Sequence, residues 1–245
     1  MKSELSDASL DKSPHRIRRM FDAIAPWYDF LNHFLSLGID RSWRTKTARL
    51  VMTEETLPGP VLDVCCGTAD LSLAFHRRTG RLGSDRKIDG IDFSEKMVEI
   101  GRRKTDGKSV QLIVGDALDL PFEDDTFSIV AVAFGLRNVG DTQRVLAEMI
   151  RVCRPGGTVA VLEFSMPTLP VLSHCYRFYF RNVLPRIGQF LAKNRDDAYR
   201  YLPESVLEFD SPAVLKQRMK QLGLVDVRIR PMTFGIATLV WGKYP

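Results

Sequence analysis

The sequence has no long apolar run. Hydrophobic residues make up 44% of the 245 residues and charged residues 27%, which is the composition of an ordinary globular protein. No stretch approaches the roughly 20 apolar residues that a membrane-spanning helix requires. Residues 1–14 are polar and lack the apolar core of a secretory signal peptide. We therefore expect a chain that does not cross a bilayer and that begins with a disordered lead at residues 1–14.

Cysteine and histidine are both scarce. The four cysteines form no CxxC pair, and the four histidines are scattered without the spacing of metal ligands. Reduced thiols are the expectation for a cytoplasmic protein, and we expect surface or packing roles for the histidines. The sequence therefore predicts a cytoplasmic protein without a metal site.

The turn within residues 61–70 is the feature that says most about a ligand, although it has a single glycine. Residues 61–70 read VLDVCCGTAD, an apolar strand followed by small residues. Gly67 supplies the positive φ or close backbone approach that a ligand turn needs, but no third glycine completes the dinucleotide fingerprint. S-adenosylmethionine carries no phosphate, and its sulfonium and amino groups suit the acidic strand end at Asp63. We predict a cradle for this cofactor, while a plain strand-to-helix turn at Gly67 stays open.

A second strand, expected at residues 87–93, also ends in a carboxylate. Asp92 closes the segment DGID, where it can accept hydrogen bonds from both hydroxyls of a ribose. Ser94 follows as a good N-cap for the next helix. Together with the turn at Gly67, this strand end predicts a nucleoside-binding βαβ unit.

Strands and helices alternate along the chain, which predicts an α/β fold with a doubly wound, mainly parallel sheet. Two closing strands with a short connection predict an antiparallel C-terminal hairpin, giving the seven-stranded, Rossmann-like sheet of class I methyltransferases. Ligands of such sheets bind at the carboxyl ends of the parallel strands. After the first strand, the expected strands are residues 87–93, 110–114, 127–134, 158–164, 225–230 and 236–243, and the expected helices are residues 70–79, 94–104, 142–153 and 211–222.

The chain is basic, with a formal net charge of +5 and a pI of about 9.1. This charge permits an acidic partner without choosing between nucleic acid and anionic lipid. Basic residues at 15–19 precede an aromatic segment at 20–31, which suits a lipid headgroup surface or a helix packed on the core. Apolar residues at helical spacing between 176 and 191 also suit either a lipid surface or a helix packed on the core.

Separated blocks of the sequence resemble one family. The chain is similar, from about residue 21 to its end, to the quinone C-methyltransferases of menaquinone and ubiquinone biosynthesis. The blocks are FDAIAPWYD at residues 21–29 with Asn32, LSLG at 35–38 and Trp43-Arg44, then AFGLRNV at 133–139, RPGG at 154–157 with LEFS at 162–165, and YRYLPES at 199–205.

The resemblance implies methyl transfer from S-adenosylmethionine to a ring carbon of a polyprenylated quinol. The acceptor is demethylmenaquinol, which the late block favours, or the ubiquinol precursor 2-polyprenyl-6-methoxy-1,4-benzoquinol. Two departures from the family pattern stand out, because Ala69 replaces a usual glycine and Ala133 a common serine. Besides Asp63 and Gly67, the expected cofactor positions are Thr68, Asp92, Asp116, Ala117 and Ala133.

Arg137 is the candidate for activating the acceptor. It follows the fourth expected strand, and its guanidinium can stabilise a phenolate and orient a water that takes the proton. The alternative is an ion pair with Asp141 or Glu163 that only holds the loop. The other residues expected around the acceptor are Asn138, Tyr28, Asp29 and Tyr201, although simple packing explains the two tyrosines equally well.

We predict three parts in the chain: the lead at residues 1–14, a helical substrate cap at 15–56, and a methyltransferase domain at 57–245 with a helical insertion at about 169–209. A nucleic acid partner is not expected, because residues 134–137 read FGLR where amino-methyltransferases often carry an Asn/Asp-Pro-Pro-aromatic block. Peripheral contact with an anionic membrane, at its inner face, and a homodimer both stay open. A non-catalytic scaffold on this fold also stays open.

Overall fold

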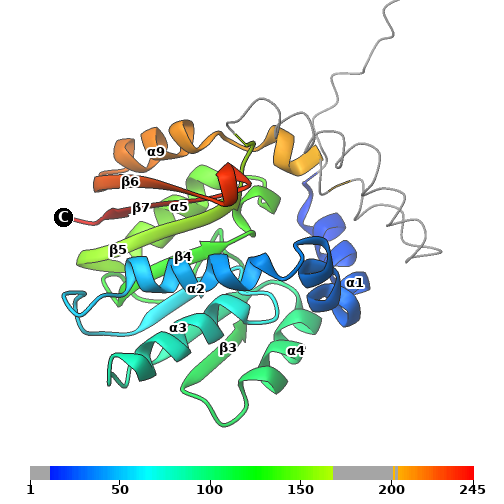
Figure 1. Cartoon of the computed structure of the whole chain (residues 1–245), viewed down its shortest axis with the longest axis horizontal. Coiled ribbons are helices and arrows are strands. Elements are labelled where there is room, and N and C mark those ends of the chain that lie inside the picture. Colours follow the sequence, from blue (N-terminus) through cyan, green and yellow to red (C-terminus); the bar gives the residue numbers. More distant parts are fainter. Residues whose placement is uncertain (1–11, 168–200, 202–203) are drawn as a thin grey trace, which may run out of the picture.

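Seven strands form one sheet in the computed structural model, which describes residues 12–167, 201 and 204–245 (Figure 1). The strand order is β3-β2-β1-β4-β5-β7-β6, with β1 to β5 parallel and β7 antiparallel to both β5 and β6. The predicted fold class and C-terminal hairpin are confirmed. The strands are β1 Val61–Val64, β2 Ile88–Asp92, β3 Val110–Val114, β4 Phe127–Ala133, β5 Cys153–Phe164, β6 Val225–Met232 and β7 Ala237–Lys243.

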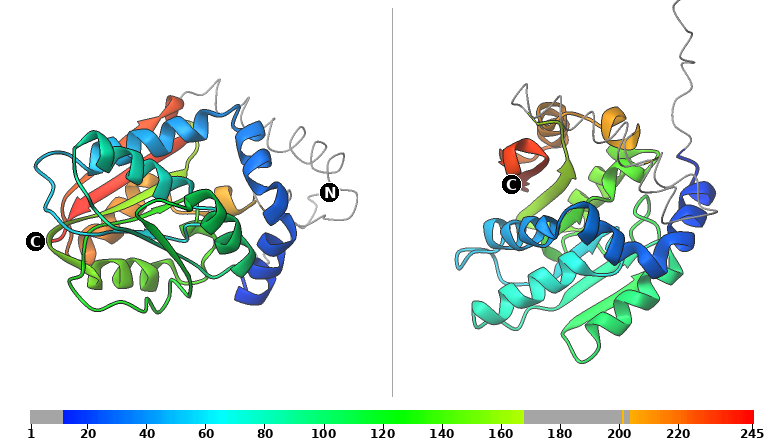
Figure 2. Two further views of the ribbon diagram at one scale, coloured as in Figure 1. Left: turned by 90° about the horizontal axis from the view of Figure 1, so that it is seen from below. Right: turned by 45° about the vertical axis from the view of Figure 1, so that its right-hand side comes forward.

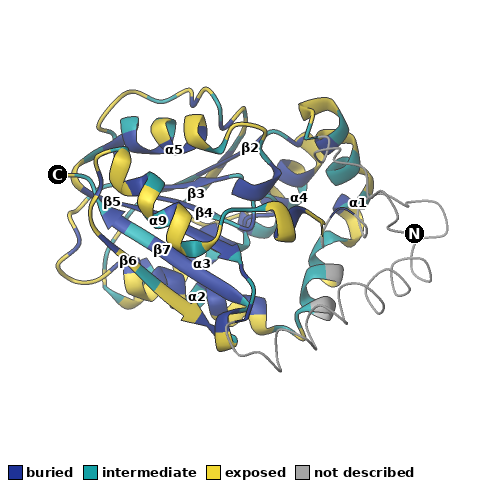
Figure 3. Ribbon diagram, turned by 90° about the horizontal axis from the view of Figure 1, so that it is seen from above, coloured by how far each residue is buried: buried dark blue, intermediate teal, exposed yellow. Residues whose placement is uncertain are grey.

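Helices cover both faces of the sheet, which is why the central strands β1 and β4 are buried along nearly their whole length (Figure 3). Helices α2 and α3 pack on one face, and α5 and α9 pack on the other. The described helices are α1 Pro14–Leu35, α2 Ile39–Val51, α3 Asp70–Arg81, α4 Glu95–Thr105, α5 Thr142–Arg151 and α9 Pro212–Gln221, with 3₁₀ turns η1 at Leu136–Asn138 and η3 at Thr233–Gly235.

Side-chain caps fix where three of these helices begin. Ser94 accepts a hydrogen bond from the Met97 amide at 3.2 Å, and Ser211 accepts one from the Val214 amide at 3.4 Å. Asp141 caps α5 in the same way. Each cap satisfies an amide that has no partner inside its helix, and the caps expected at Ser94 and Ser211 are confirmed.

Strand β5 begins earlier than the sequence predicted. The motif at residues 154–157 was expected to separate a helix ending at Cys153 from a strand beginning at Thr158, but α5 ends at Arg151 and β5 already begins at Cys153. The glycines do not break the strand, because their backbone is paired: the Gly156 amide donates to the Tyr244 carbonyl at 2.7 Å, and the Tyr244 amide donates to the Gly157 carbonyl at 3.1 Å.

The two N-terminal helices belong to different parts of the molecule, although the sequence suggested one cap at residues 15–56. Helix α2 places Trp43, Ala48 and Val51 in the core beneath the sheet. Helix α1 instead lies beside α4, across the end of the sheet (Figure 2). The substrate cap at residues 15–56 stays a prediction, and within it α1 is the helix that lies nearest the end of the sheet.

Some expectations fall outside the described part of the chain. These are the disordered lead over residues 1–11, most of the insertion at 169–209, and the apolar spacing between 176 and 191. Within the described residues, no helix has the length and apolar character needed to cross a membrane.

Candidate active site

A pocket lies where the sequence placed the ligand crevice, at the carboxyl ends of β1 to β4. Its empty volume, including the open mouth, is about 810 Å³, within the range of small-molecule sites. Helix α1 contributes Ile17, Phe21 and Tyr28 to its wall. From the predicted set, the pocket is lined by Tyr28, Gly67, Asp92, Asp116, Ala117, Ala133 and Asn138.

The turn after β1 has the unusual backbone that its small residues suggested. Gly67 has φ +54°, and a Cβ there would meet only Tyr28, at 3.8 Å, so conformation rather than space favours glycine. Ala69, which replaces the usual glycine of the family, also has a left-handed φ of 71°. An alanine in that conformation costs on the order of 1 kcal/mol relative to glycine. The turn thus keeps its shape despite this departure.

Asp92 holds the turn to the end of β2. Its carboxylate accepts hydrogen bonds from the amides of Gly67 and Ser94, each at 2.9 Å. Burial raises the pKa of Asp92 to about 6, against the two amides, which lower it, and the charge of Asp22 raises it further. Asp92 lines the pocket, so its position suits the proposed contact with a ribose.

Residues that follow β3 and β4 complete the same wall. The Asp116 carboxylate accepts from the Leu118 amide at 2.9 Å, which fixes the loop, and Ala117 is buried beside it. Ala133 ends β4, and Asn138 lies in η1. Both lie on the pocket wall.

A smaller pocket of about 300 Å³ adjoins the first one. The two share Tyr28, Cys65, Gly67 and Ala133, and the smaller pocket is also lined by Asp63. The Asp63 carboxylate accepts from the Ser72 hydroxyl at 2.6 Å. Burial raises the pKa of Asp63 to about 7, although Ser72 opposes the shift.

Thr68 also lines the smaller pocket, but its hydroxyl is bound to protein groups. It donates to Asp29 and accepts from the Lys104 ammonium at 3.1 Å. Lys104 in turn pairs with Asp29 and Asp70, each at 2.7 Å. Asp29 was expected to close over the acceptor, but it fastens α1 to the cofactor turn instead.

A second polar contact of α1 lies next to Asp92. The Ser94 hydroxyl donates to the Asp22 carboxylate at 2.6 Å, while the same oxygen caps α4. The start of α4, the strand end at Asp92 and helix α1 therefore meet at one serine.

Arg137 forms the ion pair that the sequence left open as an alternative role. Its Nη1 lies 3.0 Å from Glu163 Oε2, and it also donates to the Phe134 carbonyl. The guanidinium lies 5.2 Å from the centre of the Phe164 ring. Arg137 and Tyr201 line neither pocket, although the charge of Arg137 acts on both Tyr28 and Tyr201.

Three expected acceptor residues carry buried polar atoms without partners. Among the described residues, Arg137 Nε, Asn138 Oδ1 and Tyr201 Oη have no hydrogen bond. Burial raises the pKa of Tyr201 to about 12, against the charges of Arg137 and Arg16, so its phenol is neutral at pH 7. Buried polar atoms are normally satisfied, so each of these three atoms keeps an unused hydrogen-bonding capacity, as do single atoms of Thr47, His76, Arg86 and Arg154 elsewhere in the described residues.

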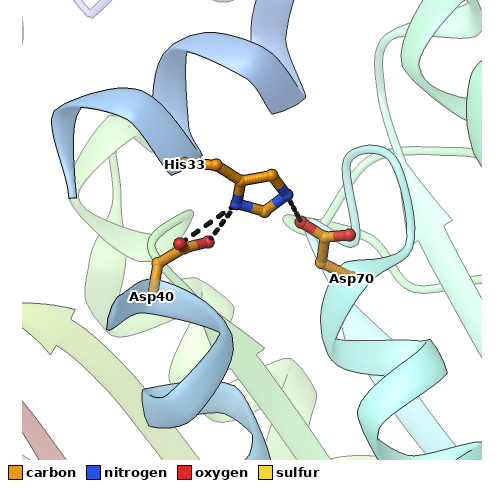
Figure 4. A group of neighbouring side chains, drawn as sticks. All are labelled: His33, Asp40 and Asp70. Atoms are coloured by element: carbon orange, nitrogen blue, oxygen red, sulfur yellow. Dashed lines mark hydrogen bonds and ion pairs between the residues drawn. The ribbon is translucent and has the colours of Figure 1, made fainter. Parts of the chain in front are cut away.

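The sequence reasoning missed a charged group at the junction of α1, α2 and α3. His33 Nδ1 lies 3.0 and 2.9 Å from the Asp40 carboxylate oxygens, and its Nε2 lies 3.9 Å from Asp70 (Figure 4). Asp40 also pairs with Arg44, which lines the smaller pocket. Arg44 stands in the block Trp43-Arg44, which was the one available signal.

Comparison with known proteins identifies close relatives. The model described as the ubiE/COQ5 methyltransferase family matches residues 9–243. The ubiquinone/menaquinone biosynthesis C-methyltransferase UbiE of Geotalea daltonii is 43% identical, and the match covers 96% of this chain and 98% of that protein. The demethylmenaquinone methyltransferase of Halalkalibacterium halodurans is 40% identical, with coverages of 93% and 91%.

Solved structures share the fold at much lower identity. A SAM-dependent methyltransferase of Thermotoga maritima has a TM-score of 0.61 and 18% identity, covering 93% of this chain and 99% of its own. A SAM-dependent methyltransferase of Aquifex aeolicus has a TM-score of 0.57 and 16% identity, covering 97% and 100%. These structures support the fold alone.

Proposed function

Because this chain belongs to the ubiE/COQ5 methyltransferase family, we propose that it methylates a ring carbon of a polyprenylated quinol, with demethylmenaquinol as the acceptor. The sequence-based prediction of a SAM-dependent C-methyltransferase of menaquinone or ubiquinone biosynthesis is confirmed by the family and its relatives. The choice of demethylmenaquinol over the benzoquinol precursor is supported by the late block at residues 199–205 and by the name of the Halalkalibacterium relative.

The main pocket fits the adenosyl group of the methyl donor. In this proposal Asp92 offers a carboxylate for the ribose hydroxyls, and Asp116 and Ala117 contact adenine; that all three line the main pocket supports the assignment. Gly67 and Ala133 leave room beside them because their side chains are absent or small. S-adenosylmethionine supplies a methyl group on a positively charged sulfur, which is already activated for transfer.

The acceptor must lose a phenolic proton so that electron density reaches the ring carbon. In this proposal Arg137 Nε–H and the Tyr201 hydroxyl stabilise the phenolate oxygen, and Asn138 Oδ1 accepts from the other hydroxyl. A water takes the proton, since a guanidinium does not act readily as a base. The ring carbon then bonds to the methyl group as the carbon–sulfur bond breaks, and loss of the ring proton restores the aromatic ring.

The three unpartnered atoms carry this assignment, because a hydroquinone has two hydroxyl groups to satisfy them. They are buried, so in this proposal the acceptor reaches them only after a local movement of the protein. The ion pair with Glu163 remains useful, since it fixes the plane of the guanidinium.

The test is methyl transfer from labelled S-adenosylmethionine, offered in parallel to a demethylated naphthoquinol, the benzoquinol precursor and RNA. We expect label on the ring carbon of the naphthoquinol. Label mainly on the benzoquinol would move the acceptor to the ubiquinone branch, and label on RNA would reject the proposal.

We also propose peripheral contact with an anionic membrane, because the polyprenyl tail keeps the acceptor in lipid. Helix α1 supports this with the exposed Arg18, Arg19 and Trp27, the last 60% exposed. Co-sedimentation with vesicles should require anionic lipid and decrease when both arginines are changed to glutamine. Equal binding to neutral vesicles would contradict the electrostatic part. A homodimer, a cytoplasmic location and the lack of a metal or nucleic acid partner remain expectations.

A further inference from the structure

We propose that Lys104 is a positioning residue for methyl transfer: it binds the carboxylate of Asp29 and thereby holds Tyr28 at the junction of the two pockets. The inference deepens the proposed function and rests on it, because the place of Tyr28 matters for the reaction only if a donor and an acceptor meet beside it. Lys104 lies in the last turn of α4, a helix from which the sequence predicted no functional residue.

The ammonium group of Lys104 meets acceptors from three other segments. It donates to Asp29 of α1 and to Asp70 at the start of α3, each at 2.7 Å, and to Thr68 of the cofactor turn at 3.1 Å. An ammonium has three N–H groups, so each of them has one partner. Lys104 thus joins α4 to α1, to the turn and to α3 through a single atom.

Both oxygens of the Asp29 carboxylate take part in this contact. One accepts from the Thr68 hydroxyl and the other accepts from Lys104. The carboxylate cannot rotate without breaking one of these bonds. The backbone of α1 beside Asp29 is therefore fixed relative to the cofactor turn.

Lys104 also separates two carboxylates. Asp29 and Asp70 both touch its ammonium, so they lie close together and would repel each other without a cation between them. Burial alone would raise the pKa of Asp70, but the charges of Arg44 and Lys104 outweigh burial and hold the pKa below its ordinary value. His33 of α1 lies 3.9 Å from Asp70 on another side (Figure 4). Asp70 therefore stays ionised, and loss of Lys104 should push α1 away from it.

Tyr28, the residue before Asp29, takes its place from the position of α1. It lines both pockets, and a Cβ at Gly67 would come 3.8 Å from its ring. The ring packs edge to face on Phe21 with the centroids 6.0 Å apart, and its hydroxyl is hydrogen-bonded to Asn32. Phe21 and Asn32 belong to the same helix, so these contacts move with it. The bonds of Asp29 therefore help to decide where Tyr28 lies above the turn.

Tyr28 is also close to the arginine proposed to activate the acceptor, because the charge of Arg137 acts on it. In this proposal the tyrosine ring sets how the acceptor approaches the methyl group. A misplacement of about 1 Å near the reacting atoms can lower a rate by about 10²-fold. The role needs no bond from Lys104 to either substrate, so Lys104 should matter for turnover more than for donor binding.

The first variant, Lys104→Met, removes the cation and keeps a side chain of similar length. With a quinol acceptor, kcat should fall by about 10- to 100-fold. The Kd of S-adenosylmethionine, measured by calorimetry, should change less than about threefold, because Asp92 and its two amide bonds are untouched.

Hydrogen exchange reports the position of α1 without any ligand. The Lys104 side chain is 26% exposed, so its loss should have the lower end of the effect of a charge-assisted pair. Backbone amides of residues 27–35 should therefore exchange with deuterium about tenfold faster in Lys104→Met.

Adding Asp29→Asn to Lys104→Met separates positioning from general destabilisation. The asparagine still accepts from Thr68 but no longer repels Asp70. The double variant should therefore regain at least about threefold in kcat and most of the protection from exchange. A lysine that only stabilised α3 or α4 would give no such recovery. If Lys104→Met does not fold, Asp29→Asn alone carries the test, with a smaller loss of kcat at an unchanged Kd.

Arg103→Met is the matched control. It removes a positive charge from the neighbouring residue of α4, whose side chain is 73% exposed and pairs with Glu99. Both kcat and the exchange of α1 should stay as in the wild type.

A wild-type kcat in Lys104→Met, or a loss that Asp29→Asn does not relieve, would overturn the proposal. The exchange measurements need neither donor nor quinol. Faster exchange that is rescued, in a protein that methylates no quinol, would reject the proposed function and keep the role of Lys104 in placing α1. Quinol methylation at the wild-type rate in Lys104→Met would do the reverse.

Discussion

The proposed active site has a cofactor end on the pocket wall and an acceptor end that includes Arg137 and Tyr201, which line neither pocket. The two ends differ in how their polar groups are satisfied. At the cofactor end, Asp92 accepts from two backbone amides and Asp63 from Ser72. At the acceptor end, Arg137 Nε, Asn138 Oδ1 and Tyr201 Oη have no partner among the described residues. The groups proposed for the cofactor are therefore already held by the protein, whereas those proposed for the acceptor are free to bond to it.

This difference predicts separate effects of mutations at the two ends. Changes at the cofactor end should weaken binding of S-adenosylmethionine, because they remove groups already aimed at the pocket. Changes at the acceptor end should lower turnover instead, because their hydrogen bonds form with the reacting quinol.

The largest effect is expected at Arg137. Arg137→Ala should lower kcat by about 10²-fold or more, the loss typical for a group that stabilises developing negative charge. The dissociation constant of S-adenosylmethionine should change little. Steady-state kinetics with a quinol and calorimetry with the methyl donor measure the two quantities.

Glu163→Gln separates catalysis from packing at this position. The Glu163→Gln substitution weakens the ion pair but keeps Arg137. If Arg137 had only a structural role, Glu163→Gln and Arg137→Ala would lose stability and activity in parallel. A catalytic arginine would leave Glu163→Gln far more active than Arg137→Ala. Full activity in Arg137→Ala would contradict the predicted role of Arg137 in turnover, and with it the predicted difference between the cofactor end and the acceptor end.

Asp92 should show the opposite pattern. Asp92→Asn is expected to weaken S-adenosylmethionine binding by roughly 10- to 100-fold through loss of charged hydrogen bonds, with a smaller change in kcat at saturating donor. Asp89→Asn, on the same strand but outside both pockets, is the matched control. A Kd that Asp92→Asn leaves at the wild-type value would place the ribose elsewhere.

Asp63 gives the cofactor end a pH dependence. Burial raises its pKa to about 7 in the ligand-free protein, and an ammonium group binds the ionised form. Affinity for S-adenosylmethionine should therefore fall by up to about tenfold per pH unit as the pH drops from 7 towards 5. Calorimetry across this range should show the slope in the wild type, and a flatter profile in Asp63→Asn.

The same shift affects stability with a defined sign. A raised pKa stabilises the folded state at low pH, and that contribution is lost as the pH rises through about 7. Asp63→Asn should therefore raise the melting temperature of the ligand-free protein at pH 8 and change it little at pH 4. An equal change at both pH values would mean that Asp63 does not hold the proton.

The smallest effect is expected where α1 covers the pocket. Asp22→Asn weakens its bond to Ser94, worth about 1 kcal/mol, so amides of α1 should exchange with deuterium up to about fivefold faster. Core strands should be unaffected. Arg19→Gln, an exposed change on the same helix, should leave exchange as in the wild type; acceleration in both variants would contradict a specific contact.

The sequence was sufficient to predict features that depend on neighbouring residues. The apolar run of β4, the turn glycine at Gly67 and the caps at Ser94 and Ser211 each follow from local chemistry. Parallel strands bring their carboxyl ends together, so Asp92 and Asp116 could be placed at one pocket before the structure was known.

Other features depend on contacts between distant segments, which periodicity does not encode. Arg44 lies on a helix whose charges look like an exposed face, yet it is buried and lines the smaller pocket together with Asp63 of β1. The bond from Lys104 to Asp29 joins residues 75 positions apart. The sequence therefore suggested Asp29 as a neighbour of the acceptor and gave no sign of its bonds to Thr68 and Lys104.

The two hydrogen bonds of Ser94 separate the attachment of α1 from the cap of α4. Its oxygen receives the Met97 amide proton, while its own proton goes to Asp22. When α1 lifts away, only the second bond is lost, and water can replace Asp22. The first turn of α4 keeps its cap and Asp92 keeps its two amide hydrogen bonds. Under the proposed function, the acceptor could therefore enter without disturbing the carboxylate that holds the methyl donor.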